Sequence, residues 1–299
     1  MSSTPVRKAV VPVAGLGTRL FPASHAVKKE LFPVVGPDGI ARALLHYHLL
    51  DLDDAGFEEI CIIVQPGEEE TVRAYINGPD DAYLRRLEKY PALHAEALRM
   101  RSLGTRVRFA VQHQQEGYGH AVYQARGFAG GEPFLLCLGD HLFRGRETPP
   151  AALLTDAWSR SDGRSVSAVN RIGPADLKGY GTIAGNRRAA DAALIEVSLI
   201  IEKPDVATAC QRLRVDGLGD DEFLGWFGMH LLAPSVFNIL ERMIRDDIRD
   251  NGEFQLTRAQ ELQRAEHGYL ALEMPPGARR FDFGTPQDML SALADFARG

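Results

Sequence analysis

KAVVPVAGLGTR, at residues 8–19, is the stretch that decides the fold of this 299-residue chain. Its apolar first half, residues 8–13, predicts a buried strand, and a turn with Gly15 and Gly17 follows directly. Glycine lets the backbone come close to a ligand and point its N–H groups at oxygen anions. Arg19, which closes the turn, adds positive charge. The opening of the chain is therefore expected to bind a phosphorylated ligand.

Outward from this stretch, the first half of the chain alternates between strand and helix patterns. A helical stripe at 41–55 and an apolar strand at 59–64 follow the turn. Such a βαβ unit joins two parallel strands by a right-handed crossover. The pattern continues with a charged helical region at 81–101, a strand at 106–112, a helix at 119–128 and a very apolar strand at 134–138.

Beyond Pro150, strands follow one another with fewer helices between them. Strands are expected at 165–171, 181–184, 193–202, 222–232 and 269–273, and helices at 151–159, 234–245, 257–266 and 286–297. This order predicts mixed or antiparallel strands added to the edge of the sheet. The expected fold class is α/β: a single domain of residues 1–299 with a doubly wound, Rossmann-like mixed sheet, mostly parallel, and extra antiparallel strands in the second half.

Charge and composition exclude several classes of protein. The net charge is -6, whereas non-specific binding of nucleic acid needs an extended basic surface. No segment approaches the roughly 18 apolar residues of a membrane span, and residues 1–9 lack the apolar core of a signal peptide. Cys61, Cys137 and Cys210 show no CxxC spacing and are expected to be buried thiols in a reducing cytosol. We therefore expect a cytoplasmic protein that binds neither nucleic acid nor a membrane.

A glycine-bearing turn after the first strand also opens the Rossmann dehydrogenases. A dinucleotide-binding fold requires a third glycine where Arg19 stands, and an acidic residue at the end of its second strand. Here the second strand ends in Val64, Gln65 and Pro66. The sequence therefore disfavours a nicotinamide cofactor.

The wider stretch, GLGTRLFPA at 15–23 with KELFP at 29–33, resembles the signature of the sugar-1-phosphate nucleotidyltransferase family. Within that family it is most similar to the motif of the bacterial UTP–glucose-1-phosphate uridylyltransferases, GLGTRxLPAT followed by PKExLP. Later segments agree in the same order: Gln112, GYGHAV at 117–122, LGD at 138–140, YG at 180–181, EKP at 202–204, GEFQLT at 252–257 and FDFG at 281–284. The resemblance spans nearly the whole chain.

The resemblance implies a homo-oligomeric enzyme that forms UDP-glucose and pyrophosphate from UTP and glucose 1-phosphate. Residues from about 1 to 145 would form the nucleotide-binding half, and residues from about 146 to 299 the sugar-binding half with the C-terminal helices. An oxygen of the sugar phosphate attacks the α-phosphorus in line with the departing pyrophosphate. Because that oxygen is already ionised, no general base is required. The protein must position two mutually repelling anions and neutralise charge on the leaving group.

Residue roles follow from the matched motifs. The resemblance assigns Arg19 and Lys29 to the triphosphate and Lys203 to the phosphate of the sugar, as the catalytic residues. Asp140 and Asp282 match the two aspartates that hold Mg2+, a metal that needs one or two carboxylates. The nucleotide-binding residues are Ala14, Gly15, Leu16, Gly17, Thr18, Gln112 and Gly117, and the sugar-binding residues are Gly181, Glu202 and Gly225. For the two sugar-binding glycines, a plain turn or bulge is an equal alternative.

The chain departs from the family motif at five positions, which are His25, Lys28, Glu116, Tyr118 and His141. None of these changes removes a phosphate-binding or metal-holding group, but several lie near the base and the sugar. A related enzyme that uses dTTP, GTP or another sugar phosphate is therefore the alternative. A catalytically silent relative would lack a metal carboxylate or the arginine of the turn, and both are present.

Overall fold

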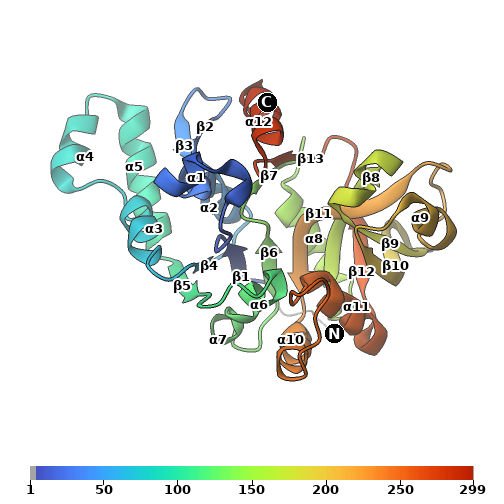
Figure 1. The fold of residues 1–299 in the computed structure, drawn as a ribbon. Helices are drawn as coiled ribbons and strands as arrows, with labels where there is room; N and C mark the ends of the chain where they lie inside the picture. The colour runs from blue at the N-terminus through green and yellow to red at the C-terminus, as the bar shows by residue number, and fades with distance from the viewer. Residues whose placement is uncertain (1–4, 299) are drawn as a thin grey trace.

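The computed structural model describes residues 5–298 and contains a nine-stranded sheet with helices on both sides (Figure 1). Its strands lie in the order β5-β4-β1-β6-β11-β8-β12-β10-β9. The four at one end run parallel: β5 (Val107–Val111), β4 (Glu59–Val64), β1 (Lys8–Pro12) and β6 (Phe134–Cys137). The strands predicted for the first half are thus confirmed, with ends shifted by about one residue.

Alternate residues of β1 and β4 face two separate cores, which is why both strands are apolar along their length. Ala9 and Val11 of β1 belong to one cluster of buried side chains, while Val10 belongs to another. The same division places Ile62 and Cys61 of β4 in different clusters. Parallel strands that are covered on both faces are typical of a doubly wound sheet. The predicted α/β class is confirmed.

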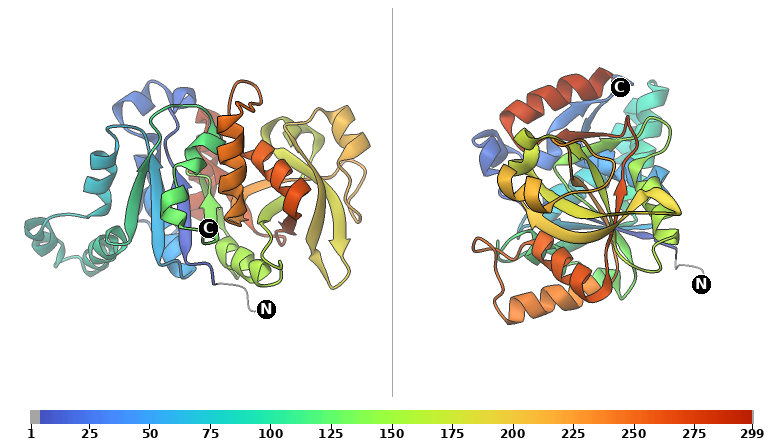
Figure 2. Two further views of the ribbon diagram at one scale, coloured as in Figure 1. Left: turned by 90° about the horizontal axis from the view of Figure 1, so that it is seen from below. Right: turned by 90° about the vertical axis from the view of Figure 1, so that its right-hand side faces the viewer.

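The helices of the first half connect and flank these parallel strands. They are α1 (Ala23–Ala26), α2 (Leu44–Asp54), α3 (Glu69–Ile76), α4 (Asp81–Leu87), α5 (Pro91–Gly104), α6 (Tyr118–Tyr123), α7 (Arg126–Ala129) and α8 (Pro150–Ser159). Figure 2 shows α4 and α5 at the end of the molecule opposite β9 and β10.

Several predicted helices differ from the observed ones. The helix expected at 41–55 begins at Leu44, because Ala41–Ala43 pairs as β3 with β2 (Pro33–Val35). The region at 81–101 is two helices, α4 and α5, because the backbone of Tyr90 is not helical and the following Pro91 disfavours helical backbone at that residue. The helix expected at 119–128 is likewise divided into α6 and α7, and α3 was not predicted.

The second half of the sheet is a ring of five paired strands. They are β8 (Val166–Ile172), β9 (Gly181–Arg188), β10 (Asp191–Glu202), β11 (Phe223–Leu232) and β12 (Leu270–Glu273). β11 runs antiparallel to β6, β8 and β9, while β10 runs antiparallel to β9 and β12. β12 and β8 are parallel. These pairings confirm the antiparallel strands predicted for this half and close the ring β11-β8-β12-β10-β9.

The α-helices that follow in the second half of the chain are α9 (Val206–Arg212), α10 (Ser235–Arg245), α11 (Leu256–His267) and α12 (Pro286–Arg298). The last three match predicted helices to within one residue at each end, and α9 was not predicted. A short antiparallel pair of strands, β7 (His141–Arg144) with β13 (Arg279–Asp282), was also not predicted. It brings the ends of two distant segments together beside β6.

Two sequence expectations about exposure have a clear outcome. Cys61 and Cys137 are buried in β4 and β6 as expected, whereas Cys210 is exposed on α9, so the prediction of three buried thiols was wrong for that residue. Among residues 5–298, each helix is too short or too polar to cross a lipid bilayer.

A buried polar network fastens α11 to the ring. Nδ1 of His230, on β11, lies 2.6 Å from Oγ of Ser167 on β8. Nε2 of Gln260, on α11, lies 3.0 Å from the same nitrogen. The hydroxyl of Tyr269 contacts both Ser167 and Gln260. Burial lowers the pKa of His230 to about 3. The network therefore contains a neutral histidine at neutral pH.

This neutral histidine makes stability depend on pH. The unfolded chain protonates a histidine near pH 6.5, whereas the folded chain does so only near pH 3, so acid favours unfolding within that window. The contribution of neutral His230 to the free energy of unfolding is complete above pH 6.5, and it falls by about 1.4 kcal/mol for each pH unit below that value. We expect the difference in unfolding free energy between the wild type and His230→Gln to shrink by about 2 kcal/mol from pH 7 to pH 5, measured by urea denaturation.

Ser165→Ala is the matched control, because it removes a buried hydrogen bond to Gln263 without removing a titratable group. Its effect on the unfolding free energy should be equal at the two pH values. A His230→Gln difference that does not change between pH 7 and pH 5 would contradict the buried neutral histidine.

Candidate functional site

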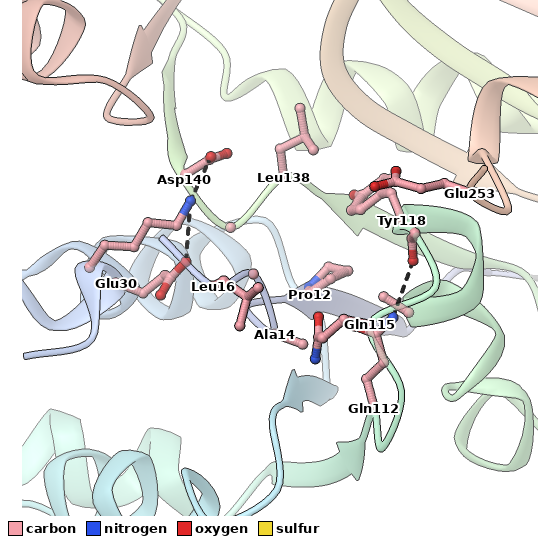
Figure 3. Close-up of a pocket in the computed structure, with 15 residues that line it drawn as sticks. Pro12, Ala14, Leu16, Glu30, Gln112, Gln115, Tyr118, Leu138, Asp140 and Glu253 are labelled. Atoms are coloured by element: carbon pink, nitrogen blue, oxygen red, sulfur yellow. Dashed lines mark hydrogen bonds and ion pairs between the residues drawn. The ribbon is translucent and has the colours of Figure 1, made fainter. Parts of the chain in front are cut away.

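A cavity of about 340 Å³ opens at the carboxyl ends of β1, β5 and β6. Its walls come from the segments that follow these strands, from the start of α6 and from the loop before α11. Figure 3 shows Asp140 and Glu30 on one side of it and Gln112 and Tyr118 on the other. Ligands of open parallel sheets bind at this end of the strands. The predicted residues that line the cavity are Ala14, Gly15, Leu16, Lys29, Gln112, Gly117 and Asp140.

The turn after β1 is held open towards the cavity. Gly17 has a φ of +65°, in the left-handed region that favours glycine. Oγ of Ser24 donates to the carbonyl of Gly17 at 2.8 Å, and Nε2 of Gln65 donates to the carbonyl of Gly15 at 3.2 Å. A Cβ atom at Gly15 would meet nothing within 4 Å, so the backbone there is accessible. Gly17 and Thr18 shape the turn but do not line the cavity.

The opposite wall carries amide groups and a hydroxyl. Gln112 is buried at the end of β5, and its Nε2 donates to the carbonyl of Gly117 at 3.2 Å. Gly117 has a φ of +111°, and a Cβ atom there would lie 2.8 Å from Cβ of Glu253, so a larger residue does not fit. The buried hydroxyl of Tyr118 has no hydrogen-bond partner among residues 5–298. This wall can therefore present polar groups to the edge of a base.

Two cations meet one carboxylate at the first wall. Nζ of Lys29 lies 2.8 Å from Oδ2 of Asp140 and 3.7 Å from Oε1 of Glu30, while Nη2 of Arg19 lies 3.9 Å from the same oxygen of Asp140. Burial alone would lower the pKa of Lys29, but the charges of Asp140 and Glu30 raise it above the usual value. Lys29 is therefore a charged amine at the cavity, next to the exposed guanidinium of Arg19.

Asp282, at the end of β13, comes close to Asp140. A Cβ atom at Gly284 would lie 2.9 Å from Oδ1 of Asp282, 3.0 Å from Nη2 of Arg19 and 3.3 Å from Oδ2 of Asp140, so both carboxylates and the guanidinium border the space beside this glycine. Burial would raise the pKa of each aspartate, but His141 at both, and Lys29 at Asp140, hold the pKa of each below its usual range. Both are therefore ionised.

The two aspartates suit one kind of metal better than others. No group of three or more His, Cys, Asp or Glu side chains within residues 5–298 forms a cage for an ion. Mg2+ does not need such a cage, since it is commonly bound by one or two carboxylates with waters and substrate phosphates. Two ionised carboxylates facing one open space, beside cations suited to phosphate, fit that pattern.

Sequence reasoning missed Glu30, which lines the cavity and is 1% exposed. Burial raises the pKa of Glu30 to about 7, and Lys28 and Lys29 offset only part of that rise. Lys28 lies 3.7 Å from Glu30 and 2.6 Å from Glu68, so it links this carboxylate to the loop before α3. The available signal was the position of Glu30 directly after Lys29 in the matched motif. Gln115, Tyr118 and Glu253 also line the cavity and were not assigned to it.

The predicted sugar-binding residues lie outside this cavity, on the ring. Gly181 begins β9 and Glu202 ends β10, and the two are cross-strand partners. A Cβ atom at Gly181 would lie 2.6 Å from Nε1 of Trp226 and 2.9 Å from Oε2 of Glu202, so its lack of a side chain is required by packing. The same oxygen of Glu202 accepts a hydrogen bond from Thr257 at 2.7 Å, which ties it to α11.

Gly225 and Lys203 complete this side. A Cβ atom at Gly225 would lie 2.7 Å from Cδ1 of Ile172, so protein atoms already fill the space next to it. Lys203 has a φ of +48°, and its half-exposed amine lies 3.9 Å from Oε1 of Glu202. The structure thus brings Gly181, Glu202 and Lys203 together, apart from the cavity that Lys29 lines.

Comparisons with known proteins agree with this arrangement. The family model described as nucleotidyl transferase matches residues 8–299. The chain is 27% identical over 292 residues to UTP–glucose-1-phosphate uridylyltransferase 1 of Staphylococcus saprophyticus, covering 98% of this chain and 93% of the relative. It is also 27% identical to UTP–glucose-1-phosphate uridylyltransferase of Bacillus subtilis, covering 98% of this chain and 91% of that protein.

Solved structures are similar over nearly the whole chain. A UTP-bound UGPase from Acinetobacter baumannii superimposes with a TM-score of 0.78 at 25% identity, covering 97% of this chain and 93% of that one. A UDP-glucose pyrophosphorylase complexed with UDP-glucose has a TM-score of 0.76 at 22% identity, covering 97% and 98%. The match to residues 8–299, with the fold and the cavity described above, confirms the resemblance seen in the motifs: the chain belongs to the nucleotidyl transferase family.

Proposed function

We propose that this chain forms UDP-glucose and pyrophosphate from UTP and glucose 1-phosphate. The observation that carries the proposal is the cavity at the carboxyl ends of the parallel strands, where Lys29 and Arg19 converge on Asp140. Relatives that are 27% identical over 98% of the chain are named UTP–glucose-1-phosphate uridylyltransferases. Cations beside a glycine turn suit a triphosphate, and the carboxylate suits the metal that accompanies it.

The uracil base is assigned to the wall formed by Gln112 and Gly117. An amide side chain offers both a donor and an acceptor, which matches the alternating donor and acceptor atoms on the edge of uracil. Gln112 is buried and bonded to the Gly117 carbonyl, so its amide is fixed in one orientation. Fixed polar groups discriminate more strongly between bases than mobile ones, because a mismatched base leaves them unpaired.

The triphosphate is assigned to the turn of residues 14–19 and to Lys29. Backbone N–H groups of the turn can approach the phosphates because no side chain covers Gly15. Lys29 and Arg19 then neutralise the charge that builds on the departing pyrophosphate. The Lys29 amine lies 2.8 Å from Asp140, so this carboxylate holds it at the cavity to which the triphosphate is assigned.

Mg2+ is the proposed cofactor, held by Asp140 and Asp282. When bound, the ion supplies positive charge against the phosphate oxygens. The sugar 1-phosphate is assigned to the residues at the ends of β9 and β10, with Lys203 at its phosphate and Glu202 accepting hydrogen bonds from its hydroxyl groups. The sugar phosphate oxygen is ionised at neutral pH, so the chain needs to orient it rather than deprotonate it.

A substrate panel tests the proposed reaction. Pyrophosphate release is measured with UTP, dTTP or GTP and glucose 1-phosphate, and then with UTP and other sugar 1-phosphates. We expect kcat/KM to be about 10-fold or more higher for UTP with glucose 1-phosphate than for any other pair, since buried polar groups penalise a mismatched substrate. Equal turnover with dTTP or GTP would contradict the assignment, and no turnover with any pair would indicate a binding protein.

Lys29→Met tests the role of the buried amine. Because the methionine side chain has similar length without charge, we expect kcat to fall by about 100-fold or more at saturating substrates. Lys89→Met, at an exposed position after α4, is the matched control and should leave kcat unchanged. A Lys29→Met enzyme with kcat within about twofold of the wild type would remove Lys29 from the catalytic residues.

A further inference from the structure

His141 lies between the two carboxylates that are proposed to hold the metal. Its Nδ1 is 2.8 Å from Oδ1 of Asp140, and its Nε2 is 3.2 Å from Oδ2 of Asp282. The ring is buried and stacks on Phe143, with ring centroids 6.3 Å apart and planes inclined by 18°. Both ring nitrogens are thus engaged by carboxylates, and the ring plane is fixed by packing.

The strand pairing makes this contact a property of the backbone. His141 is the first residue of β7, and in the antiparallel pair with β13 its direct partner is Asp282. Side chains at directly opposite positions of such a pair are close enough to interact. Just beyond the pair, the backbone N–H of Phe283 donates to the carbonyl of Asp140 at 2.9 Å. The imidazole therefore lies between Asp140, the residue directly before β7, and Asp282, its cross-strand partner on β13.

Each carboxylate uses one oxygen for His141 and turns the other away from it. Oδ2 of Asp140, which Lys29 contacts at 2.8 Å, and Oδ1 of Asp282, which accepts a hydrogen bond from the backbone N–H of Gly284 at 2.7 Å, are the oxygens that border the space beside Gly284. A carboxylate with a partner on one oxygen only can still rotate about its last bond, and two like charges that face one space repel. Contacts from a single rigid ring to the other two oxygens add a second restraint on each carboxylate and hold the two groups together.

We propose that His141 is a positioning residue, which fixes the oxygen of Asp140 and the oxygen of Asp282 that face the metal. The inference rests on the proposed metal site and adds to it a residue at which this chain departs from the family motif. Partners that hydrogen-bond to metal-binding groups typically change metal affinity by about 10- to 100-fold when they are removed. His141 touches neither substrate nor product in this role, because it acts through the two aspartates.

Binding of Mn2+ to the full chain, followed by electron paramagnetic resonance without substrates, tests the inference. Mn2+ is a suitable probe because it accepts the same oxygen ligands as Mg2+. We expect His141→Ala to raise the Kd for Mn2+ by about 10- to 100-fold. His141→Gln, which keeps an N–H donor but no charge, should lie between the wild type and the alanine variant. An unchanged or lower Kd in His141→Ala would overturn the inference.

Two further variants separate this inference from the metal site itself. Asp282→Asn should abolish the binding of Mn2+; if it does so while His141→Ala binds normally, the metal site stands and the positioning role is wrong. If Asp282→Asn binds Mn2+ like the wild type, the site is wrong and the inference falls with it. His25→Ala, at an exposed position, should leave the Kd unchanged. If His141→Ala does not fold, the same comparison is made with His141→Gln and His141→Asn, with folding checked by thermal unfolding.

Discussion

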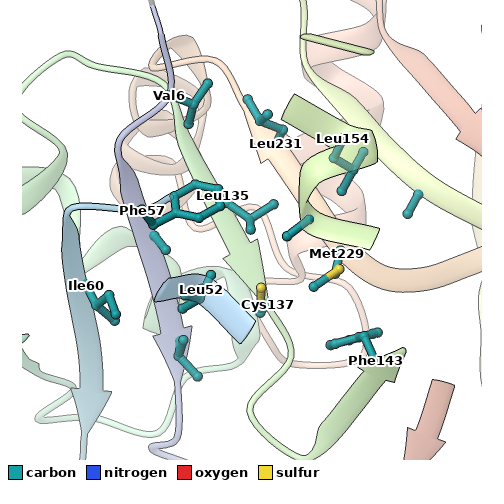
Figure 4. Packing of buried hydrophobic residues seen from close by; sticks show 14 of the residues in the cluster. Val6, Leu52, Phe57, Ile60, Leu135, Cys137, Phe143, Leu154, Met229 and Leu231 are labelled. Carbon is teal, nitrogen blue, oxygen red and sulfur yellow. The ribbon is translucent and has the colours of Figure 1, made fainter. Parts of the chain in front are cut away.

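The site depends on one backbone contact, where the ends of the parallel strands β1 and β6 meet. A Cβ atom at Gly139 would lie 2.4 Å from the carbonyl oxygen of Pro12, so only glycine permits this approach. The pairing itself is held by apolar packing, and Figure 4 shows Leu135 and Cys137 of β6 in the same cluster as Phe57 and Ile60. Because the two strands end together, the glycine-bearing turn after β1 and Asp140 leave the sheet side by side.

Opposite charges at this end of the sheet stabilise one another within a largely buried setting. Lys29 lies between Asp140 and Glu30, and Lys28 lies between Glu30 and Glu68. Burying a charge without a partner costs free energy, so each of these groups lowers the cost of burying its neighbour. Lys28 and Lys29 each have two carboxylate partners, so either amine can lose one contact without being left unpaired.

Much of the fold was predictable because its strands are continuous apolar runs that need cover on both faces. The apolar runs at residues 8–13 and 134–138 each predicted a strand that the structure contains. The position of Asp140 soon after the second run predicted a residue at the end of the sheet where the cavity opens. The contact between His141 and Asp282 was not predictable, because it depends on the register of two short strands separated by more than a hundred residues. The burial of Glu30 was missed because a charged residue is expected at the surface.

The closed ring of β11, β8, β12, β10 and β9 has a mechanical consequence for the site proposed for the sugar 1-phosphate. In an open sheet an edge strand can swing outward by breaking one ladder of hydrogen bonds, but here each strand of the ring has paired neighbours on both sides. The ends of β9 and β10, with Gly181 and Glu202, are therefore braced from two directions. Strands braced in this way cannot move apart one at a time to make room for a larger ligand. It accommodates change by rotating whole side chains or by tilting as one rigid body.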